Sequence, residues 1–370
     1  MRVLMTCGGT GGHINPAIAI ANTIKENIPD AEILFVGTQK GKESILVPKA
    51  GYDLKFVKSE GIRRSLSPAN IKALVRAVIS PYAAKKVIRE FAPDVVVGTG
   101  GYACWPVLRG AAMLKVPTVV HESNAIPGMA VKRLQKSVGK ILTNFDKTKD
   151  YIDNKEKVIR VGNPFMGGFS TMEKAAAREK HGIPADALCV LSYGGSGGAE
   201  FLNQIAVDVM KAHVASNQDV IFVHAAGSRD YAATQARFEE LGLDRCQNIS
   251  LFEYIYDMPE WMAAADVVVC RAGAMTISEL SIMGKASVMI PSPNVVDNHQ
   301  YKNAKVLADA DATCLLTEGE LTVDMLWHNL EEILYRSERR EALENNIRAF
   351  AEPDANERIF GEIMAMIKEK

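Results

Sequence analysis

Two glycine clusters, each interrupted by one hydroxyl-bearing residue, are the segments of this sequence best suited to bind a charged ligand. They read Gly8-Gly9-Thr10-Gly11-Gly12 and Gly194-Gly195-Ser196-Gly197-Gly198. A glycine-rich turn at the start of a helix lets the backbone approach a phosphate, whose oxygens accept hydrogen bonds from the N–H groups of the first helical turn. The clusters therefore predict a phosphorylated ligand, with the Thr10 and Ser196 hydroxyls as further donors. A turn that needs glycine only for its backbone conformation is the alternative for either cluster alone.

The spacing within the clusters excludes two common nucleotide-binding motifs. The dinucleotide fingerprint Gly-x-Gly-x-x-Gly fails because its last glycine would fall on Ile14 in the first cluster and on Glu200 in the second. A Walker loop ends in Gly-Lys-Ser/Thr, whereas His13 and Ala199 follow the last glycines here. We expect neither an NAD-dependent enzyme nor a P-loop nucleotidase.

His13 stands directly after the first cluster, and Asn15-Pro16 then opens a helical segment with proline where a helix tolerates it. Imidazole has an ordinary pKa of about 6.5, so it can take a proton from an attacking hydroxyl near neutral pH. His13 is therefore the candidate general base, and a purely structural histidine is the alternative.

A third segment with possible ligand-binding residues begins at Arg271, directly after an apolar segment. It reads Arg-Ala-Gly-Ala-Met-Thr-Ile-Ser-Glu-Leu. Glycine followed by a helix that carries Glu279 can place a carboxylate on two neighbouring hydroxyls, which is how proteins commonly hold a ribose. A glutamate on a solvent-exposed helix face is the alternative.

Alternating strand-like and helix-like segments must position these residues, and they form two series. The expected strands are 3–5, 33–36, 94–97 and 118–120 in the first series and 188–191, 219–223, 266–269 and 286–290 in the second, with helices near 16–27, 68–90 and 104–115. This alternation is typical of parallel strands joined by helices. Each series predicts a doubly wound sheet with a glycine cluster after its first strand. Ligands bind such sheets at the carboxyl ends of the strands, so we expect the active site in a cleft between two lobes.

Composition excludes several other classes of protein. The chain has 370 residues, with 43 Lys and Arg against 44 Asp and Glu, 48% hydrophobic residues and 24% charged residues. It is therefore neither a strongly basic nucleic-acid binder nor a disordered chain. A single core seldom exceeds roughly 250–300 residues, which favours two domains.

The cysteines and the N-terminal segment favour a cytoplasmic protein. Cysteines at 7, 104, 189, 246, 270 and 314 lack the short spacing of a structural zinc site, so we expect buried free thiols. The apolar residues before Cys7 are too few for a signal peptide, and no run approaches the ~18 apolar residues of a membrane span.

Seven motifs, in order across nearly the whole chain, closely resemble those of the MurG family, the bacterial glycosyltransferases that make lipid II. They are Gly8 to His13, Gly98-Thr99-Gly100-Gly101-Tyr102, His121-Glu122-Ser123-Asn124, Gly162-Asn163-Pro164, Gly194-Gly195-Ser196, Arg271-Ala272-Gly273-Ala274 and Asp297 to Asn303. The resemblance implies an α/β GT-B fold, in which two Rossmann-like doubly wound parallel-sheet domains enclose a cleft. We expect an acceptor domain at 1–163, a donor domain at 164–346 and a terminal segment, 347–370, whose helix packs back on the first domain.

The same resemblance implies the reaction, which is transfer of N-acetylglucosamine from UDP to the 4-hydroxyl of the muramoyl sugar of lipid I, with inversion and without a cofactor. It implies contacts to UDP-N-acetylglucosamine from Thr10, Gly11, Gly12, Asn124, Ser196, Ile255, Arg271, Ala274, Met275, Thr276, Glu279, His299 and Gln300. Contacts to the acceptor are implied for Gly9, Gly100, Gly101 and Tyr102.

The expected mechanism needs a base and a way to stabilise the departing UDP. His13 is the candidate base, and Glu122 is an alternative base or an orienter of His13. Backbone N–H groups after Gly195 can meet the charge that grows on UDP. The sequence has no Asp-x-Asp run, so no metal is expected.

An amphipathic segment is the candidate for contact with the membrane that carries lipid I. Ile71, Leu74, Val75 and Val78 recur at helical spacing, with Arg76 among the neighbouring cations, a pattern that suits anionic lipid headgroups. Packing of the same stripe on the first sheet is the alternative. We expect Pro81 to end this segment. Cell-wall synthesis and division proteins are possible partners, and nucleic acid is not.

Four positions depart from the family pattern, namely Ser123, Val131, Met166 and Gly197, where glutamine, asparagine, arginine and glutamine are usual. They put individual contacts in doubt, and the lost arginine and glutamine at Met166 and Gly197 predict weaker or rearranged diphosphate contacts on the donor side. The main alternative function is a UDP-N-acetylglucosamine 2-epimerase of similar fold, which needs no lipid acceptor. A silent UDP-sugar-binding subunit and a transferase that uses diacylglycerol are less favoured, because the acceptor motifs are present.

Overall fold

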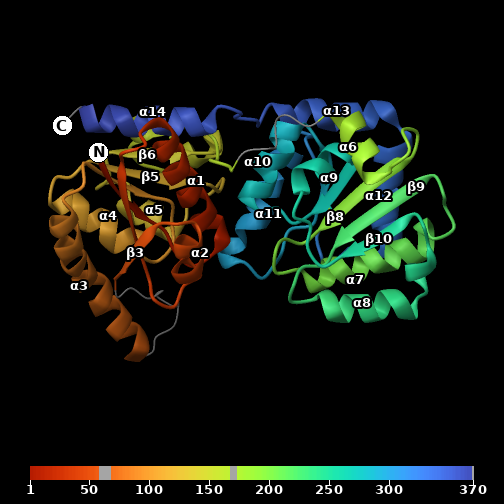
Figure 1. Ribbon diagram of the computed structural model, residues 1–370, viewed down its shortest axis with the longest axis horizontal. Helices are drawn as coiled ribbons and strands as arrows, with labels where there is room; N and C mark the ends of the chain where they lie inside the picture. Colours follow the sequence, from red (N-terminus) through yellow and green to blue (C-terminus); the bar gives the residue numbers. More distant parts are fainter. Residues whose placement is uncertain (58–67, 167–172, 369–370) are drawn as a thin grey trace. The chain divides into compact units, whose positions relative to one another are not determined.

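The computed structural model describes residues 1–57, 68–166 and 173–368, with backbone only for residues 68–78. The chain divides into two compact units. Unit 1 is Met1–Met166 with Glu352–Lys370, and unit 2 is Gly167–Ala351. Each unit is a parallel sheet covered by helices on both faces (Figure 1).

Unit 1 contains, within its described residues, a seven-stranded sheet of order β3-β2-β1-β4-β5-β6-β7 in which all pairs are parallel. The strands are β1 (Arg2–Thr6), β2 (Glu32–Gly37), β3 (Asp53–Phe56), β4 (Val95–Gly98), β5 (Thr118–Glu122), β6 (Lys140–Thr143) and β7 (Val158–Arg160). The helices are α1 (Gly11–Asn27), α2 (Glu43–Lys49), α3 (Pro68–Phe91), α4 (Cys104–Met113), α5 (Met129–Leu134) and α14 (Ala355–Lys368). The strand order reverses direction between β1 and β4, where open α/β sheets bind ligands.

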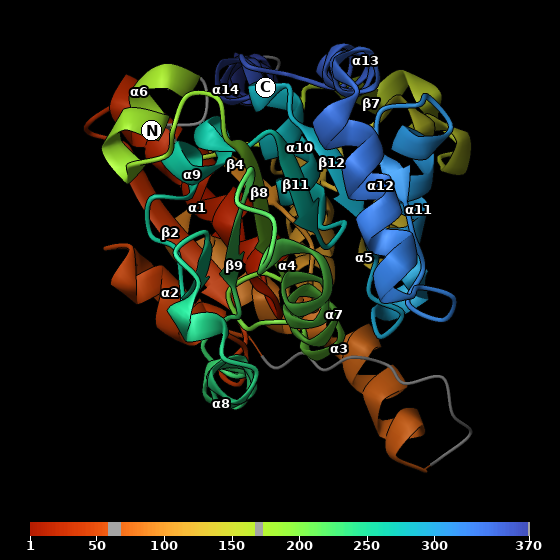
Figure 2. The same cartoon turned by 90° about the vertical axis from the view of Figure 1, so that its right-hand side faces the viewer.

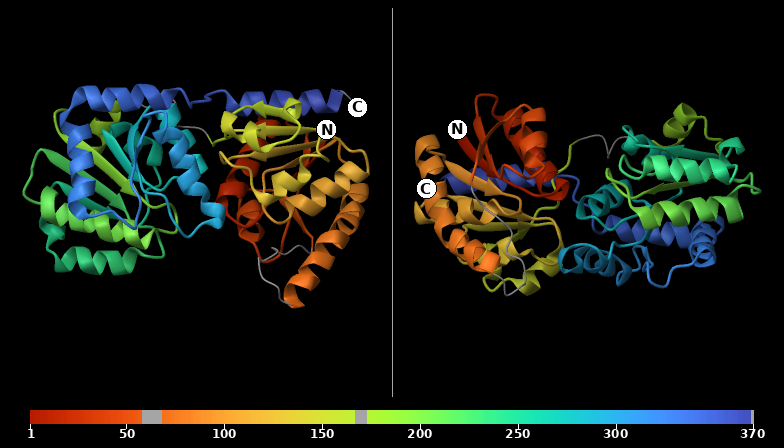
Figure 3. Two further views of the ribbon diagram at one scale, coloured as in Figure 1. Left: turned by 180° about the vertical axis from the view of Figure 1, so that it is seen from behind. Right: turned by 90° about the horizontal axis from the view of Figure 1, so that it is seen from below.

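Strand residues of unit 1 alternate between two cores, one on each face of the sheet. Val3 and Met5 join a core with residues of α1 and α14, while Leu4 joins a second core with residues of α3 and α4. This period of two is expected for strands buried on both faces. Figure 3 shows α3 and α4 from behind.

Unit 2 contains, within its described residues, a six-stranded parallel sheet of order β10-β9-β8-β11-β12-β13. The strands are β8 (Leu188–Tyr193), β9 (Val220–Ala225), β10 (Ile249–Phe252), β11 (Val267–Cys270), β12 (Ala286–Met289) and β13 (Cys314–Leu315). The helices are α6 (Lys174–His181), α7 (Glu200–Val209), α8 (Tyr231–Glu240), α9 (Met258–Ala264), α10 (Ala274–Met283), α11 (His299–Ala308), α12 (Val323–Tyr335) and α13 (Ser337–Arg348). In Figure 2, α7 and α12 lie beside the strands with which they share the main core of this unit.

Helix α14 packs on unit 1 although unit 2 precedes it in the chain. Its residues Ile359 and Ile363 are buried in the core that contains α1. Glu362 pairs with Lys140 at 2.7 Å, and the Asn356 side chain bonds both the N–H and the carbonyl of Phe165. The chain therefore leaves unit 1 and returns to complete its core.

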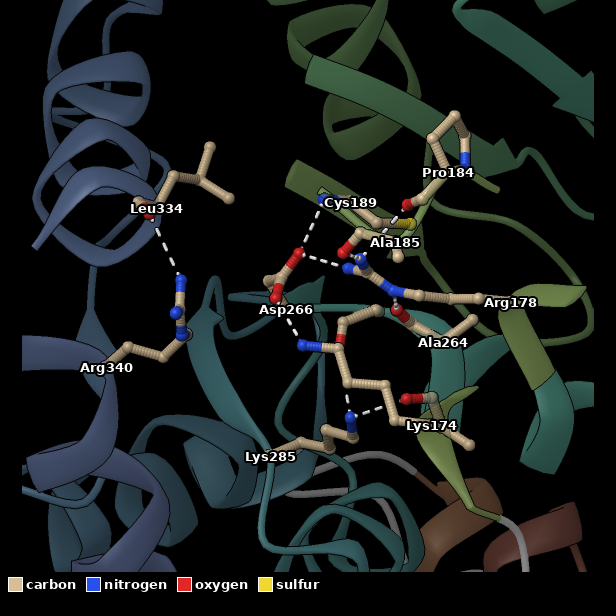
Figure 4. A network of polar contacts seen from close by, with 12 residues as sticks. Lys174, Arg178, Pro184, Ala185, Cys189, Ala264, Asp266, Lys285, Leu334 and Arg340 are labelled. Carbon is tan, nitrogen blue, oxygen red and sulfur yellow. Dashed lines mark hydrogen bonds and ion pairs between the residues drawn. The ribbon is translucent and has the colours of Figure 1, made fainter. Parts of the chain in front are cut away.

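A buried ion cluster fixes α6 to the sheet of unit 2 (Figure 4). Asp266 accepts hydrogen bonds from Lys174 at 2.6 Å, from Arg178 at 2.7 Å and from the Cys189 N–H at 2.7 Å. Burial alone would raise the pKa of Asp266, but the bonds from Lys174 and Cys189 outweigh it and lower that pKa. The cluster thus ties the start of unit 2 to β8 and β11.

Several sequence expectations need correction. Pro81 does not end its helix, because α3 continues through it to Phe91. Tertiary packing explains this, since α4 lies so close that a Cβ at Gly110 would be 2.8 Å from the Pro81 carbonyl oxygen. The short strands β3, β6, β7, β10 and β13 were not expected. All six cysteines are free, as expected, and Cys7, Cys104, Cys189 and Cys270 are buried, but Cys246 and Cys314 are only partly buried. Across the described ranges, no helix is long and apolar enough to cross a membrane.

Candidate active site

The first glycine cluster lies between β1 and α1, at the point where the strand order of unit 1 reverses. Thr10 is the N-cap of α1, and its carbonyl accepts from the N–H groups of His13 and Ile14. The N–H groups before His13 therefore precede the first intrahelical hydrogen bond, as anion binding requires. Gly9 differs, because its N–H donates to Glu43 Oε2 at 2.9 Å. The Gly9 N–H is thus already engaged within the protein.

The second motif of unit 1 follows the adjacent strand β4 and packs directly on this loop. A Cβ at Gly100 would lie 2.6 Å from His13 Cδ2, and one at Gly101 would lie 2.1 Å from the Gly8 oxygen. Gly101 also has φ of +88°, a conformation that favours glycine. Thr99 Oγ1 donates to the His13 carbonyl at 2.6 Å. The fold therefore brings His13, Gly100 and Gly101 together, with Tyr102 exposed beside them.

The imidazole of His13 has a defined tautomer. His13 Nδ1 lies 3.2 Å from the Gly8 carbonyl oxygen, and a carbonyl only accepts hydrogen bonds, so Nδ1 carries the proton. In the neutral ring Nε2 then carries the lone pair, which is the form that a general base needs.

Glu122 ends β5 and organises the turn that follows it. Its carboxylate accepts from Asn124 N–H at 3.0 Å, Asn124 Nδ2 at 3.1 Å and Gly128 N–H at 2.7 Å. Both carboxylate oxygens are therefore engaged in this turn, and Asn124 is positioned by the same contacts.

The second glycine cluster follows β8 and packs on the loop after β9. A Cβ at Gly198 would lie 2.3 Å from the Ala226 oxygen, and one at Gly227 would lie 2.0 Å from Gly198 N. The Ser196 carbonyl accepts from the Ser228 N–H and hydroxyl, both at 3.3 Å. Ser196 itself is exposed, so its hydroxyl is accessible to a ligand.

Helix α10 starts at Ala274 after Gly273 and follows β11, the strand that pairs with β8. Its first-turn residues Ala274, Met275 and Thr276 are partly exposed, and Glu279 is half-buried. Burial raises the pKa of Glu279 to about 7, as expected where no charge compensates a carboxylate. Glu279 is thus a carboxylate that would gain from hydroxyl donors.

Arg271 is largely buried and has partners within unit 2. Its guanidinium donates to the Ile290 carbonyl at 2.9 Å and pairs with Glu318 at 2.5 Å, and only 11% of its side chain is exposed. Its charge is therefore already compensated within unit 2.

The remaining donor candidates lie on the loop after β10 and at the start of α11. Ile255 is buried between the exposed Tyr254 and Tyr256. His299 Nδ1 contacts the Val296 carbonyl at 2.9 Å, and Gln300 Oε1 accepts from Ser292 N–H at 2.8 Å. Both α11 residues thus have contacts that fix their orientation.

Comparison with known proteins identifies the family. The models for the glycosyltransferase family 28 N-terminal and C-terminal domains match residues 3–143 and 189–359. An Acetivibrio thermocellus protein named UDP-N-acetylglucosamine–N-acetylmuramyl-(pentapeptide) pyrophosphoryl-undecaprenol N-acetylglucosamine transferase is 39% identical and covers 100% of this chain and 99% of its own. A Bacillus cytotoxicus protein of the same name is 37% identical over 100% of both chains. The Acinetobacter baumannii MurG structure is 26% identical, with a TM-score of 0.79 over 98% of this chain and 99% of its own.

The chain belongs to the MurG family of glycosyltransferases. Its GT-B fold is thereby confirmed. A UDP-GlcNAc 2-epimerase from Neisseria meningitidis shares that fold at 13% identity, with a TM-score of 0.67 over 99% of this chain and all of its own.

The departures from the MurG family pattern have distinct surroundings. Ser123 is buried, and its hydroxyl is 3.5 Å from His121 Nδ1. Val131 is buried in the core that also contains residues of α3 and α4. Met166 is exposed, and a Cβ at Gly197 would face open space. Ser123 and Val131 therefore serve packing, whereas Met166 and Gly197 leave accessible positions without an arginine or an amide.

The side chains of the predicted membrane segment lie outside the described residues, and some residues that contact the site were not predicted from the sequence. Ile71, Leu74, Val75, Arg76 and Val78 lie within the backbone range of α3, but their side chains lie outside the described residues. Further along α3, Ile79 and Tyr82 are exposed. Glu43 and Glu318 contact the predicted residues Gly9 and Arg271, yet no local motif marks them.

Proximity alone gives one candidate metal site among the described side chains. His181, Asp257 and Glu260 lie close enough to share an ion. Lys180 Nζ, however, is 2.6 Å from Glu260 Oε2, so a cation already occupies this carboxylate. The group lies between α6 and α9 and contains no predicted site residue.

Proposed function

We propose that the chain transfers N-acetylglucosamine from UDP-N-acetylglucosamine to the 4-hydroxyl of the N-acetylmuramyl sugar of lipid I, with inversion, and so forms lipid II for peptidoglycan. The observation that carries this proposal is the pair of glycine loops, each at the reversal point of its own parallel sheet. One loop adjoins a histidine and the other a serine. The names of the full-length relatives support the same reaction.

Unit 2 is the proposed donor domain. Glu279 holds the ribose hydroxyls, and Ile255 and Arg271 lie around the uracil. Ser196 and the N–H groups at the start of α7 meet the diphosphate, where helix N-termini stabilise the charge on departing UDP. Ala274, Met275 and Thr276 line the first turn of α10, and His299 and Gln300 face the sugar.

Unit 1 is the proposed acceptor domain, and His13 is the proposed base. With Nδ1 bound to the Gly8 carbonyl, Nε2 can take the proton of the attacking 4-hydroxyl as the new glycosidic bond forms and the bond to UDP breaks. Glu122 is less suited to this step because Asn124 and Gly128 engage its oxygens. Tyr102 and Asn124 lie near the reacting sugar, and Gly100 and Gly101 near the acceptor diphosphate.

We further propose that the enzyme works as a peripheral protein on the cytoplasmic face of the plasma membrane, where lipid I is anchored. The exposed Ile79 and Tyr82 and the neighbouring Lys85 and Lys86 on α3 support this, because apolar groups among cations suit anionic headgroups. Cell-wall synthesis and division proteins are the expected partners.

The deciding experiment supplies labelled UDP-N-acetylglucosamine and a short-chain lipid I analogue, with a chelator present. We expect label in a disaccharide lipid only when the acceptor is added. Appearance of UDP-N-acetylmannosamine without acceptor would instead establish an epimerase. Unchanged donor in both arms would leave a binding protein.

A further inference from the structure

Glu43, the first residue of α2, is a fully buried carboxylate beneath the glycine loop of unit 1. Oε2 accepts from Gly9 N–H at 2.9 Å, while Oε1 accepts from Thr38 N–H at 2.8 Å and from Thr38 Oγ1 at 2.6 Å. One side chain thus joins the loop after β1 to the loop after β2.

Glycines make room for this carboxylate. A Cβ would lie 2.9 Å from Glu43 Oε1 if added at Gly8, 2.6 Å from Cγ at Gly37 and 2.0 Å from Oε2 at Gly41. None of these glycines has a positive φ, so their backbone conformations are open to other residues. Space for Glu43 is therefore what requires glycine at these positions.

The charge on Glu43 is retained despite its burial. Burial alone would raise the pKa of Glu43, but the bonds from the Thr38 side chain and from the Gly9 and Thr38 N–H groups lower it overall. The neighbouring thiols supply no charge, because burial raises the pKa of Cys7 well above its usual range and that of Cys104 to about 12. A carboxylate is thus held beneath a loop suited to anions, where its negative charge would weaken the binding of an anion. We therefore expect Glu43 to act on the conformation of the loop.

A single peptide group connects Glu43 to His13. The Gly9 N–H that donates to Glu43 and the Gly8 carbonyl that lies 3.2 Å from His13 Nδ1 belong to the same peptide bond. No cis peptide occurs in the described part of the chain, so this rigid plane points its N–H and its carbonyl in opposite directions. Fixing the N–H therefore fixes the carbonyl, and a carboxylate on the N–H also strengthens the carbonyl as an acceptor.

We propose that Glu43 is a positioning residue for His13, acting through the Gly8–Gly9 peptide to hold the imidazole with Nδ1 protonated and Nε2 facing the acceptor. The inference rests on the proposed function, because it assumes that His13 is the base. Glu43 itself touches no substrate. Its role is comparable to that of the aspartate that orients a catalytic histidine, except that one peptide group lies between the Glu43 carboxylate and the His13 imidazole.

Glu43→Gln tests this inference, because it preserves the size of the side chain and removes the charge. We expect kcat to fall about 10- to 100-fold, as when a group that orients a functional imidazole is lost, with KM for UDP-N-acetylglucosamine unchanged. Loss of the negative charge destabilises the imidazolium, so the acid limb of the pH profile of kcat, measured at saturating donor so that Glu279 does not contribute, moves to lower pH. In a His13→Ala background, Glu43→Gln should cost nothing further, since residues that act as a unit are not additive.

Asp94→Asn is the matched control. Asp94 accepts from the Arg2 N–H at 2.8 Å, at the opposite end of β1 from the glycine loop. This variant should keep kcat within a few-fold of the original value and leave the acid limb in place.

Each outcome decides the matter. An unchanged acid limb in folded Glu43→Gln, or a full further loss in the His13→Ala background, would overturn the positioning role. If Glu43→Gln does not fold, Thr38→Val removes only the 2.6 Å bond to Oε1, and it must lower kcat and shift the same limb. Two earlier results separate this inference from the proposed function. Failure of the unmodified protein to label lipid I would overturn the proposed function, and near-normal turnover of His13→Ala would show that His13 is not the base.

Discussion

The guanidinium of Arg271 and the carboxylate of Glu318 form a largely buried ion pair, with 2.5 Å between Nη2 and Oε1 and 11% and 18% of the two side chains exposed. The residues are far apart in sequence, and the pair ties the end of β11 to the segment after β13. Arg271 can therefore lie beside a ligand without needing a charge from it.

Glu318→Gln should destabilise unit 2, because it leaves the buried charge of Arg271 without its partner. Breaking one side of such a pair costs about 3–5 kcal/mol when burial is complete, and the remaining exposure makes the lower end of this range the expected value. Denaturant unfolding followed by the unit 2 tryptophans measures it. Adding Arg271→Met should recover part of the loss, and a double variant less stable than Glu318→Gln would refute this explanation.

His13→Ala should lower kcat by about 10²-fold or more, because general-base catalysis typically contributes that much. Binding of UDP, which we place in unit 2, should stay unchanged by calorimetry. Turnover within a few-fold of the original protein would show that another group takes the proton.

Glu279→Gln should remove a pH dependence of stability. The pKa of Glu279 is raised to about 7 in the folded protein from an ordinary value of 4.5, so its charged form destabilises the fold. That cost is absent below the ordinary pKa and complete above the raised one. Without ligand, the variant should unfold at a higher temperature than the original protein at pH 8 and at the same temperature near pH 4.5.

The same residue should make UDP binding depend on pH. A carboxylate accepts ribose hydroxyls more strongly than its protonated form, so affinity should fall as pH drops below about 7. Calorimetric titrations at pH 6 and 8 compare the original protein with Glu279→Gln, which should bind more weakly and lack this trend. An equal trend in both proteins would remove Glu279 from the ribose.

Ile363→Ala should destabilise unit 1 by about 2–5 kcal/mol, the usual cost of truncating a buried isoleucine. Ile363 is fully buried in the core shared with α1. Hydrogen exchange should show faster opening of β1 and β4 with little change in β8 and β11. Met325→Ala is the control with little expected effect, because this residue of α12 is 41% exposed.

Much of the fold follows from local sequence. The strongly apolar runs became central strands, such as β4 and β11, because strands buried on both faces need continuous β-branched residues. The edge strand β3 was missed because Asp53 and Lys55 make it half polar, and such a run is equally typical of a loop.

The site was predictable where glycine clusters follow strands, and less so where distant residues meet. Glu43 precedes Ser44 at the start of a short helix. An acidic residue at this position is ordinarily solvent-exposed and is stabilised by the helix dipole. The full burial of Glu43 and its contacts with Gly9 and Thr38 distinguish it. Glu318 was missed for the same reason, because nothing near it in sequence indicates Arg271.

The return of α14 to unit 1 has a consequence during synthesis on the ribosome. All of unit 2 is translated before residues 352–368, which bring Ile359 and Ile363 to the core of unit 1. Domains generally fold as units while the chain emerges, so unit 2 can finish folding while unit 1 still exposes an apolar face beside α1. The first part of the chain to be made is therefore the last to reach its native state, and the nascent protein depends most on chaperones during that interval.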